Sequence, residues 1–106
     1  MSTFAFIYHG GSHPEGEEAC DKMMTDWKNW MASLRDDTVD PGNPVGMSKT
    51  VMSDGSIVDN GGSNPTCGYS LFRAKDMEDA LNKAKGCPHL GIGGSIEVAE
   101  VIDLPM

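Results

Sequence analysis

The stretch TFAFIYHGG, residues 3–11, decides how the rest of the chain can fold. Its aromatic and branched residues, followed by two glycines, predict a strand that ends at Gly10. Side chains alternate between the two sides of a strand, and both sides are largely apolar here: Phe4, Phe6 and Tyr8 on one, Ala5, Ile7 and His9 on the other. We therefore expect both faces of this strand to be covered.

A helix is predicted directly after this strand. Ser12-His13-Pro14-Glu15 has the spacing of a capping box, with proline in the first turn. Apolar side chains then recur at helical spacing: Ala19, Met23, Trp27, Trp30, Met31 and Leu34. This stripe is expected to cover one face of a sheet.

The middle of the chain predicts a connector and further strands. Residues 39–46 contain two prolines and two glycines and are predicted to have no regular structure. Residues 47–52 predict a strand, Asp54-Gly55 a tight hairpin turn, and residues 57–58 a short return strand. A polar loop is expected over residues 59–65, followed by a third main strand over residues 67–74.

The last third predicts a second helix and a final strand. Asp76 is the expected N-cap and Gly86 the expected left-handed C-cap, with Met77, Ala80, Leu81 and Ala84 as the buried stripe. The strand is predicted over residues 95–104. On its apolar face Glu100 is either paired or pocket-facing, or it is turned outward by a bulge, which we favour.

The order strand, helix, strand, strand, helix, strand is that of the ferredoxin-like α+β fold, here as one domain over residues 1–106. Right-handed crossovers place both helices on one face of a four-stranded antiparallel sheet. The other face keeps apolar residues such as Ile7 and Leu71. We expect a second copy to cover that face in a homodimer and to enclose a small cavity.

Charge and composition exclude several classes of partner. The 8 basic and 16 acidic side chains give a formal net charge of −8, and no basic cluster could neutralise nucleic-acid phosphates or an anionic membrane surface. We expect neither partner. Three cysteines at no framework spacing, and an N-terminus with no basic leader before its apolar stretch, favour a cytoplasmic protein.

Several short motifs, taken in order, resemble the YCII-related family and especially its DGPF-type branch. They are Ile7-Tyr8 ending a strand, an Asp54-Gly55 hairpin, Gly68-Tyr69 opening a strand, Cys87-Pro88 after a short helix, and Ser95-Ile96-Glu97-Val98 after a glycine-rich turn. The likeness spans nearly the whole chain. It implies a dimeric α/β barrel built from two ferredoxin-like subunits.

The resemblance implies less about activity, because most members of this family have none assigned. A similar enzyme is a dehydrochlorinase of a chlorinated hydroxyquinol, with a His/Asp pair proposed as its acid/base centre. Where the branch has Asp-Gly-Pro-Phe, this chain has Asp59-Asn60-Gly61-Gly62, so only the aspartate is matched. His89 follows Cys-Pro, as a histidine does in some relatives.

Four residues are candidates for a site. His89 is either an acid/base group, since imidazole titrates near neutrality, or a polar residue that holds its turn. Asp59 would orient His89 if the two meet across the cavity, or it forms an ordinary Asx turn. His9 and Tyr69 line the substrate pocket, or else His9 ends its strand in solvent and Tyr69 belongs to the core.

Two functions therefore stand as hypotheses. The first is a small-molecule lyase or isomerase in which His89 and Asp59 transfer protons inside the dimer's cavity. The second is a dimer that binds a small ligand without catalysis. A metal site is not expected, because Cys87, His89, His9 and His13 fit no ligand spacing, and no organic cofactor is implied.

Overall fold

The computed structural model describes residues 1–59, 62 and 64–104. Its elements, in chain order, are β1 (Ser2–Gly10), α1 (Glu17–Ser33), the 3-10 helix η1 (Arg35–Asp37), β2 (Thr38–Pro44), β3 (Thr50–Val51), β4 (Ile57–Val58), β5 (Thr66–Ala74), α2 (Met77–Ala84), the 3-10 helix η3 (Pro88–Ile92) and β6 (Gly94–Glu100). Residues 60, 61 and 63 of the predicted polar loop lie outside this description.

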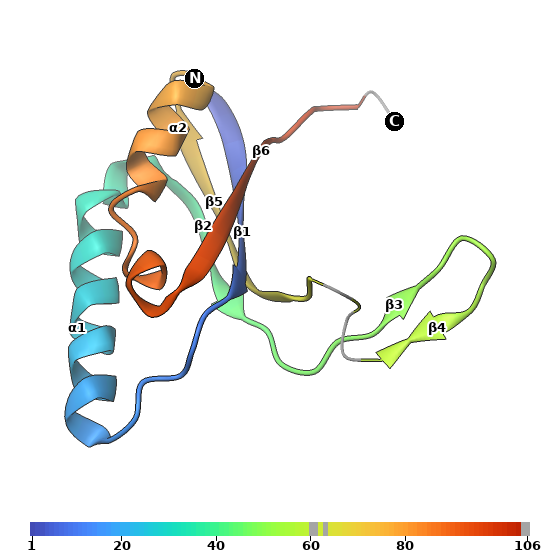
Figure 1. Ribbon diagram of the computed structural model, residues 1–106. Coiled ribbons are helices and arrows are strands. Elements are labelled where there is room, and N and C mark those ends of the chain that lie inside the picture. Colours follow the sequence, from blue (N-terminus) through green and yellow to red (C-terminus); the bar gives the residue numbers. More distant parts are fainter. Residues whose placement is uncertain (60–61, 63, 105–106) are drawn as a thin grey trace.

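One four-stranded antiparallel sheet carries the fold, in the order β2-β5-β1-β6. Both helices cover the same face of this sheet (Figure 1). Among the described residues, strands β3 and β4 pair with each other and form a separate hairpin. Without that hairpin the element order is that of the ferredoxin-like fold, so the predicted α+β class and helix placement are confirmed.

Strand β2 shows that the predicted connector over residues 39–46 was wrong. Thr38 pairs with Phe72 and Pro44 with Gly68, with register shifts between them. Because β2 is an edge strand with a neighbour on one side only, it tolerates prolines and bulges that a central strand would not. The strand predicted over residues 47–52 instead supplies β3 of the separate hairpin.

Aromatic rings fill the space between the sheet and α1. Phe6 and Phe72 come from neighbouring strands, are fully buried, and hold their ring centroids 4.8 Å apart. Trp30 of α1 packs on Phe72 with centroids 5.4 Å apart. The predicted α1 stripe is confirmed from residue 23 to residue 34, whereas Ala19, one turn nearer the N-terminus, is exposed.

Helix α1 begins later than predicted. Its N-cap is Gly16, with no side-chain capping bond, and the capping box expected at Ser12 does not form. The backbone N–H of Ser12 instead donates to the carbonyl of Ile92 at 3.0 Å. Residues 11 and 12 therefore lie against η3 before the helix starts, and this path shapes the site described below.

Helix α2 begins as predicted, because the N–H of Asp79 donates to the Asp76 carboxylate at 2.9 Å. Its buried stripe is only half right: Ala80 and Ala84 are buried, while Met77 and Leu81 are 41% and 44% exposed. An eight-residue helix beside the edge strand β6 leaves this flank open. The predicted left-handed cap at Gly86 is also wrong, because the helix ends at Lys85 in a right-handed conformation.

Strand β6 ends at Glu100 rather than continuing to residue 104. Glu100 pairs in register with Phe4, so the bulge that we favoured is absent. The side chain is exposed because it lies at the end of the sheet. Because the Glu100 carboxylate remains in contact with water, it carries no desolvation cost on the apolar face of β6.

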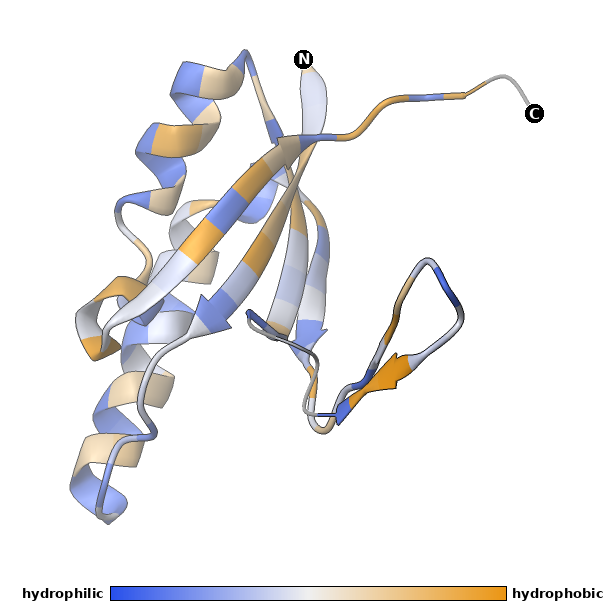
Figure 2. Ribbon diagram, turned by 45° about the vertical axis from the view of Figure 1, so that its right-hand side comes forward, coloured by the Kyte–Doolittle hydropathy of each residue, from blue (hydrophilic) through white to orange (hydrophobic). Residues whose placement is uncertain are grey.

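The face of the sheet opposite the helices is not covered by any described helix. Ala5, Ile7, Tyr69 and Leu71 alternate with the buried residues of β1 and β5 and lie side by side on this open face. The β3–β4 hairpin and the chain after β6 extend on the same side and carry apolar residues of their own (Figure 2).

Candidate functional site

A pocket of about 430 Å³ lies on the helix side of the sheet. Its wall combines the end of β1, residues 11–14, the middle of α1, the end of β2, the start of β5, and η3. The lining is mostly apolar, with Trp27, Met24 and Met31 from α1, and it contains a few polar groups such as Ser70 and His89. Such a composition is typical of small-molecule sites.

His89 is the titratable group that η3 places in this pocket. The residue is only 5% exposed. Its Nε2 donates to the backbone carbonyl of His9 at 2.8 Å, and its ring meets the ring of Tyr8 edge to face, with centroids 5.6 Å apart. The imidazole thus links η3 to the end of β1, as expected for a residue that holds its turn. The same side chain also lines the pocket.

Two glycines give the His89 ring its space. A Cβ on Gly94 would collide with the imidazole, Nε2 most closely. A Cβ on Gly11 would lie 3.1 Å from Cε1 of the same ring. The glycine-rich turn before β6 therefore holds His89 in place as well as reversing the chain.

The hydrogen bond to His9 selects one tautomer of His89. A carbonyl oxygen only accepts, so Nε2 carries the proton and Nδ1 is the acceptor nitrogen of the neutral ring. Nδ1 has no hydrogen-bond partner among the described residues. No described side-chain nitrogen or oxygen is both unpartnered and fully buried, so Nδ1 keeps access to open space.

A fixed chain of hydroxyl groups lies beside His89. The Tyr8 hydroxyl donates to Ser70 Oγ at 2.9 Å, and Ser70 donates to the carbonyl of Pro41 at 2.8 Å. Burial raises the pKa of Tyr8 well above its usual value, although the bond to Ser70 acts against the shift. Tyr8 therefore stays neutral and leaves its oxygen lone pairs as acceptors.

The two cysteines near His89, Cys67 and Cys87, are held in the protonated thiol form. Cys67 Sγ lies 3.9 Å from His89 Nε2, and burial raises the pKa of this thiol. Burial also raises the pKa of Cys87 to about 11, against a smaller lowering by the backbone N–H of His89. Because the thiolate is the reactive form, both are unreactive near neutral pH.

His9 faces the open side of the sheet rather than this pocket. Its Nε2 lies 3.1 Å from Glu97 Oε1 and its Nδ1 lies 3.3 Å from the carbonyl of Pro65. The Glu97 carboxylate and the Pro65 carbonyl both accept hydrogen bonds, so the two ring nitrogens of His9 each face an acceptor. His9 thereby links β1, β6 and the start of β5, with no ring nitrogen left over for a ligand.

The remaining two candidates lie apart from each other. Tyr69 borders the helix-side pocket, but its place in the alternation of β5 puts its side chain on the open face beside Ile7. Asp59 has an exposed side chain that forms an ion pair with Lys49 at 3.3 Å, and it is not part of the pocket wall. Within one chain, no described contact joins Asp59 to His89, so their pairing across a dimer stays a prediction.

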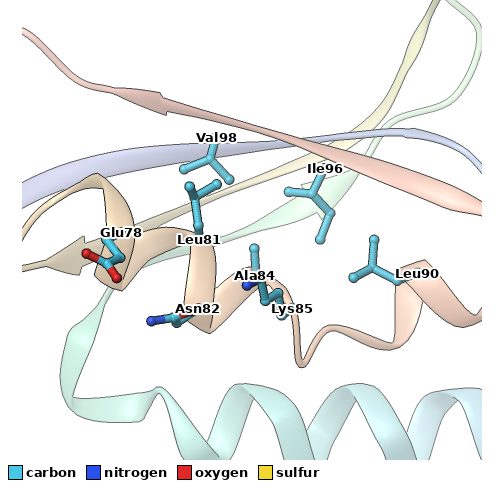
Figure 3. Close-up of a pocket in the computed structure, with 8 residues that line it drawn as sticks. All are labelled: Glu78, Leu81, Asn82, Ala84, Lys85, Leu90, Ile96 and Val98. Carbon is cyan, nitrogen blue, oxygen red and sulfur yellow. The ribbon is translucent and has the colours of Figure 1, made fainter.

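A second pocket, of about 310 Å³, lies between α2 and β6. Figure 3 shows Leu81 pointing toward Val98, with Ile96 and Leu90 at the other end. It contains no buried polar group that could orient a ligand, since its charged residues, Glu78 and Lys85, are exposed. We therefore place the candidate site at His89.

No protein-family model matches the sequence, and no curated protein matches it either. Among the described residues, no three His, Cys, Asp or Glu side chains gather as a metal site would need. No helix in the described ranges is long and apolar enough to cross a membrane. What the site does must therefore be argued from its own geometry.

Several residues of the site were missed from the sequence. The helical spacing of Trp27 indicates packing alone, and no sequence pattern gives Tyr8 or Ser70 a role in a site. The signal that could have found them is the strand alternation, because Tyr8 and Ser70 fall on the helix side of β1 and β5. Glu97 was also missed as the partner of His9, although it lies on the same face of the neighbouring strand.

Proposed function

We propose that this protein is a small-molecule-binding domain whose ligand occupies the helix-side pocket against His89. The observation that carries the proposal is a buried imidazole in the wall of a mostly apolar pocket, with one nitrogen fixed to a backbone carbonyl and the other without a partner among the described residues. The pocket volume of about 430 Å³ falls within the range of small-ligand sites, roughly 300–1,000 Å³.

The lining indicates the character of the ligand. The indole of Trp27, with Met24 and Met31 beside it, favours an apolar or aromatic body. The polar groups nearby offer acceptors, namely Nδ1 of His89 and the hydroxyl oxygen of Tyr8. A neutral ring compound with one hydrogen-bond donor fits both features.

A matched pair of probes tests this proposal. We expect 1-naphthol to bind about 5-fold more tightly than 1-methoxynaphthalene, which has the same body without a donor, because one hydrogen bond contributes about 1 kcal/mol. Ligand-observed NMR and the fluorescence change of Trp27 measure both affinities. In a His89→Phe variant the preference should disappear.

The control is His13→Ala, which removes a different and exposed imidazole from the same pocket wall. It should leave the preference for 1-naphthol intact. Equal affinities of the two probes for the wild-type protein, or a preference that survives His89→Phe, would contradict the proposal.

A lyase or isomerase is the second candidate. The fixed tautomer of His89 favours it, because a neutral nitrogen free to accept a proton is what a general base requires. The resemblance to YCII-related proteins supports the same chemistry by analogy. In this alternative Asp59 would come from a second copy, and replacing Asp59 with asparagine should lower turnover without weakening probe binding.

The proposal includes a homodimer assembled through the open face of the sheet. The chain exposes 7436 Å² of surface, whereas a compact protein of 11.3 kDa exposes about 5,700 Å², so the excess is about 1,700 Å². Its radius of gyration is 15.2 Å, against about 13 Å for a compact domain of this length. An excess of this size per chain matches a stable homodimer interface, which buries about 2,000–5,000 Å² in all.

An Ile7→Asp variant tests the dimer, because Ile7 lies in the middle of the open face between Tyr69 and Glu97. We expect light scattering to give twice the chain mass of 11.3 kDa for the wild type and a single chain mass for the variant. Burying an unpaired carboxylate in the interface accounts for the loss. A wild-type monomer at micromolar concentration would contradict the dimer.

A further inference from the structure

The β3–β4 hairpin forms a sheet of its own, separate from the four-stranded sheet that carries the core. We call residues 47–58 the arm. Each of its strands has two residues, and within the described ranges the two strands pair with each other and with no strand of the main sheet. A two-stranded hairpin is at best marginally stable by itself in water, so an arm of this kind needs something to pack against.

The arm presents apolar side chains to solvent. Val51 and Ile57 are directly opposed across the hairpin, so they lie on one face of it, and they are 71% and 63% exposed. Met47, at the start of the arm, is almost entirely exposed. Figure 2 shows these apolar colours on an arm that stands away from the helices and the sheet.

The position of the arm points to what covers it. In Figures 1 and 2 the helices lie on one side of the sheet and the arm extends on the other, the side of the open face. A second copy seated on the open face would therefore lie on the same side of the sheet as the arm. In a twofold-symmetric pair, each arm would reach the other chain, and both arms would be covered at once.

We propose that the arm is a docking element that embraces a second copy of this chain. The arm's Val51–Ile57 face then packs on the other subunit beside its open face. The surface excess supports a second copy rather than a small partner, because about 1,700 Å² per chain is what a stable homodimer covers on each side. This inference rests on the proposed dimer and adds to it a second, separable contact.

The test is a double variant, Val51→Asp with Ile57→Asp, that places two carboxylates on the covered face of the arm. We expect the dissociation constant of the dimer, measured by analytical ultracentrifugation, to rise by at least about 100-fold. The arm lies outside the core around Phe6 and Trp30, so the circular dichroism and tryptophan emission of each subunit should stay unchanged.

Lys28→Glu is the matched control, because it changes the net charge by the same two units at an exposed position on α1. It should leave the dissociation constant within about twofold of the wild type. Hydrogen exchange of the arm amides gives a second readout that needs no substitution. Their protection should be present in the concentrated wild-type protein and fall on dilution.

The outcomes separate the arm from the dimer. If the double variant remains a dimer while Ile7→Asp is monomeric, the arm proposal is wrong and the open-face dimer stands. If the arm amides show no protection in a dimeric wild type, the arm proposal is equally wrong. If the wild type is monomeric, and its arm becomes protected only with a different protein, a second copy is the wrong occupant.

Discussion

A Gly94→Ala variant is expected to lose the donor preference of the pocket and about 5-fold of its affinity for 1-naphthol. The added Cβ would occupy the place of the His89 ring, so the imidazole must rotate away and give up its 2.8 Å bond to the His9 carbonyl. Leaving that acceptor unpaired costs a further ~1–3 kcal/mol of stability. Probe titration and urea unfolding measure the two effects.

The control for this variant is Gly91→Ala, in the 3-10 helix that carries His89, where an added Cβ meets no atom within 4 Å. It should bind both probes as the wild type does. A double-mutant cycle with His89→Ala sharpens the test, since Gly94→Ala should cost little once the ring is gone. Equal costs of Gly94→Ala in the presence and absence of His89 would show that the two residues do not interact.

A Phe72→Ala variant is expected to lose about 3–5 kcal/mol of unfolding free energy, the usual cost of truncating a buried phenylalanine. Phe72 is 0% exposed and contacts both Phe6 and Trp30. Since small domains have only about 5–15 kcal/mol of stability, much of the variant should unfold at moderate urea concentrations. Tryptophan emission follows the transition.

Phe72→Leu provides the comparison, because a branched side chain of similar volume should cost less than about 1.5 kcal/mol. Arg73→Ala, an exposed neighbour on the same strand, should be close to neutral. The expected loss of unfolding free energy in Phe72→Ala is about 3–5 kcal/mol. A measured loss below about 1 kcal/mol would instead show that the space between the sheet and α1 collapses around the missing side chain.

The sequence predicted the fold class because its strongest patterns are local. The alternation of apolar side chains in β1 and their helical spacing in α1 can be read from neighbouring residues, because one face of each element packs in the core. The N-cap of α2 depends on the side chain of Asp76 itself. The same reasoning failed at β2, where Pro41 and Pro44 predict a loop. Propensity could not show that this segment lies at an edge, where missing N–H groups are tolerated.

The site was less predictable because it depends on contacts between distant residues. His89 was singled out for its chemistry, but its partner is a backbone carbonyl 80 residues away, which no side-chain pattern can indicate. Pairing His89 with Asp59 followed the family resemblance, whereas a single chain places Asp59 beside Lys49. The requirement for glycine at position 94 also comes from the packed ring, not from the turn.

The prolines of β2 have a consequence for aggregation. An exposed sheet edge can recruit further strands from other molecules, and unlimited growth needs both edges to be open. At the β2 edge, Pro41 and Pro44 lack N–H groups, so one side of the sheet is a poor template. Edge-to-edge pairing through β6 would join two molecules and then stop, which protects an exposed sheet from forming fibrils.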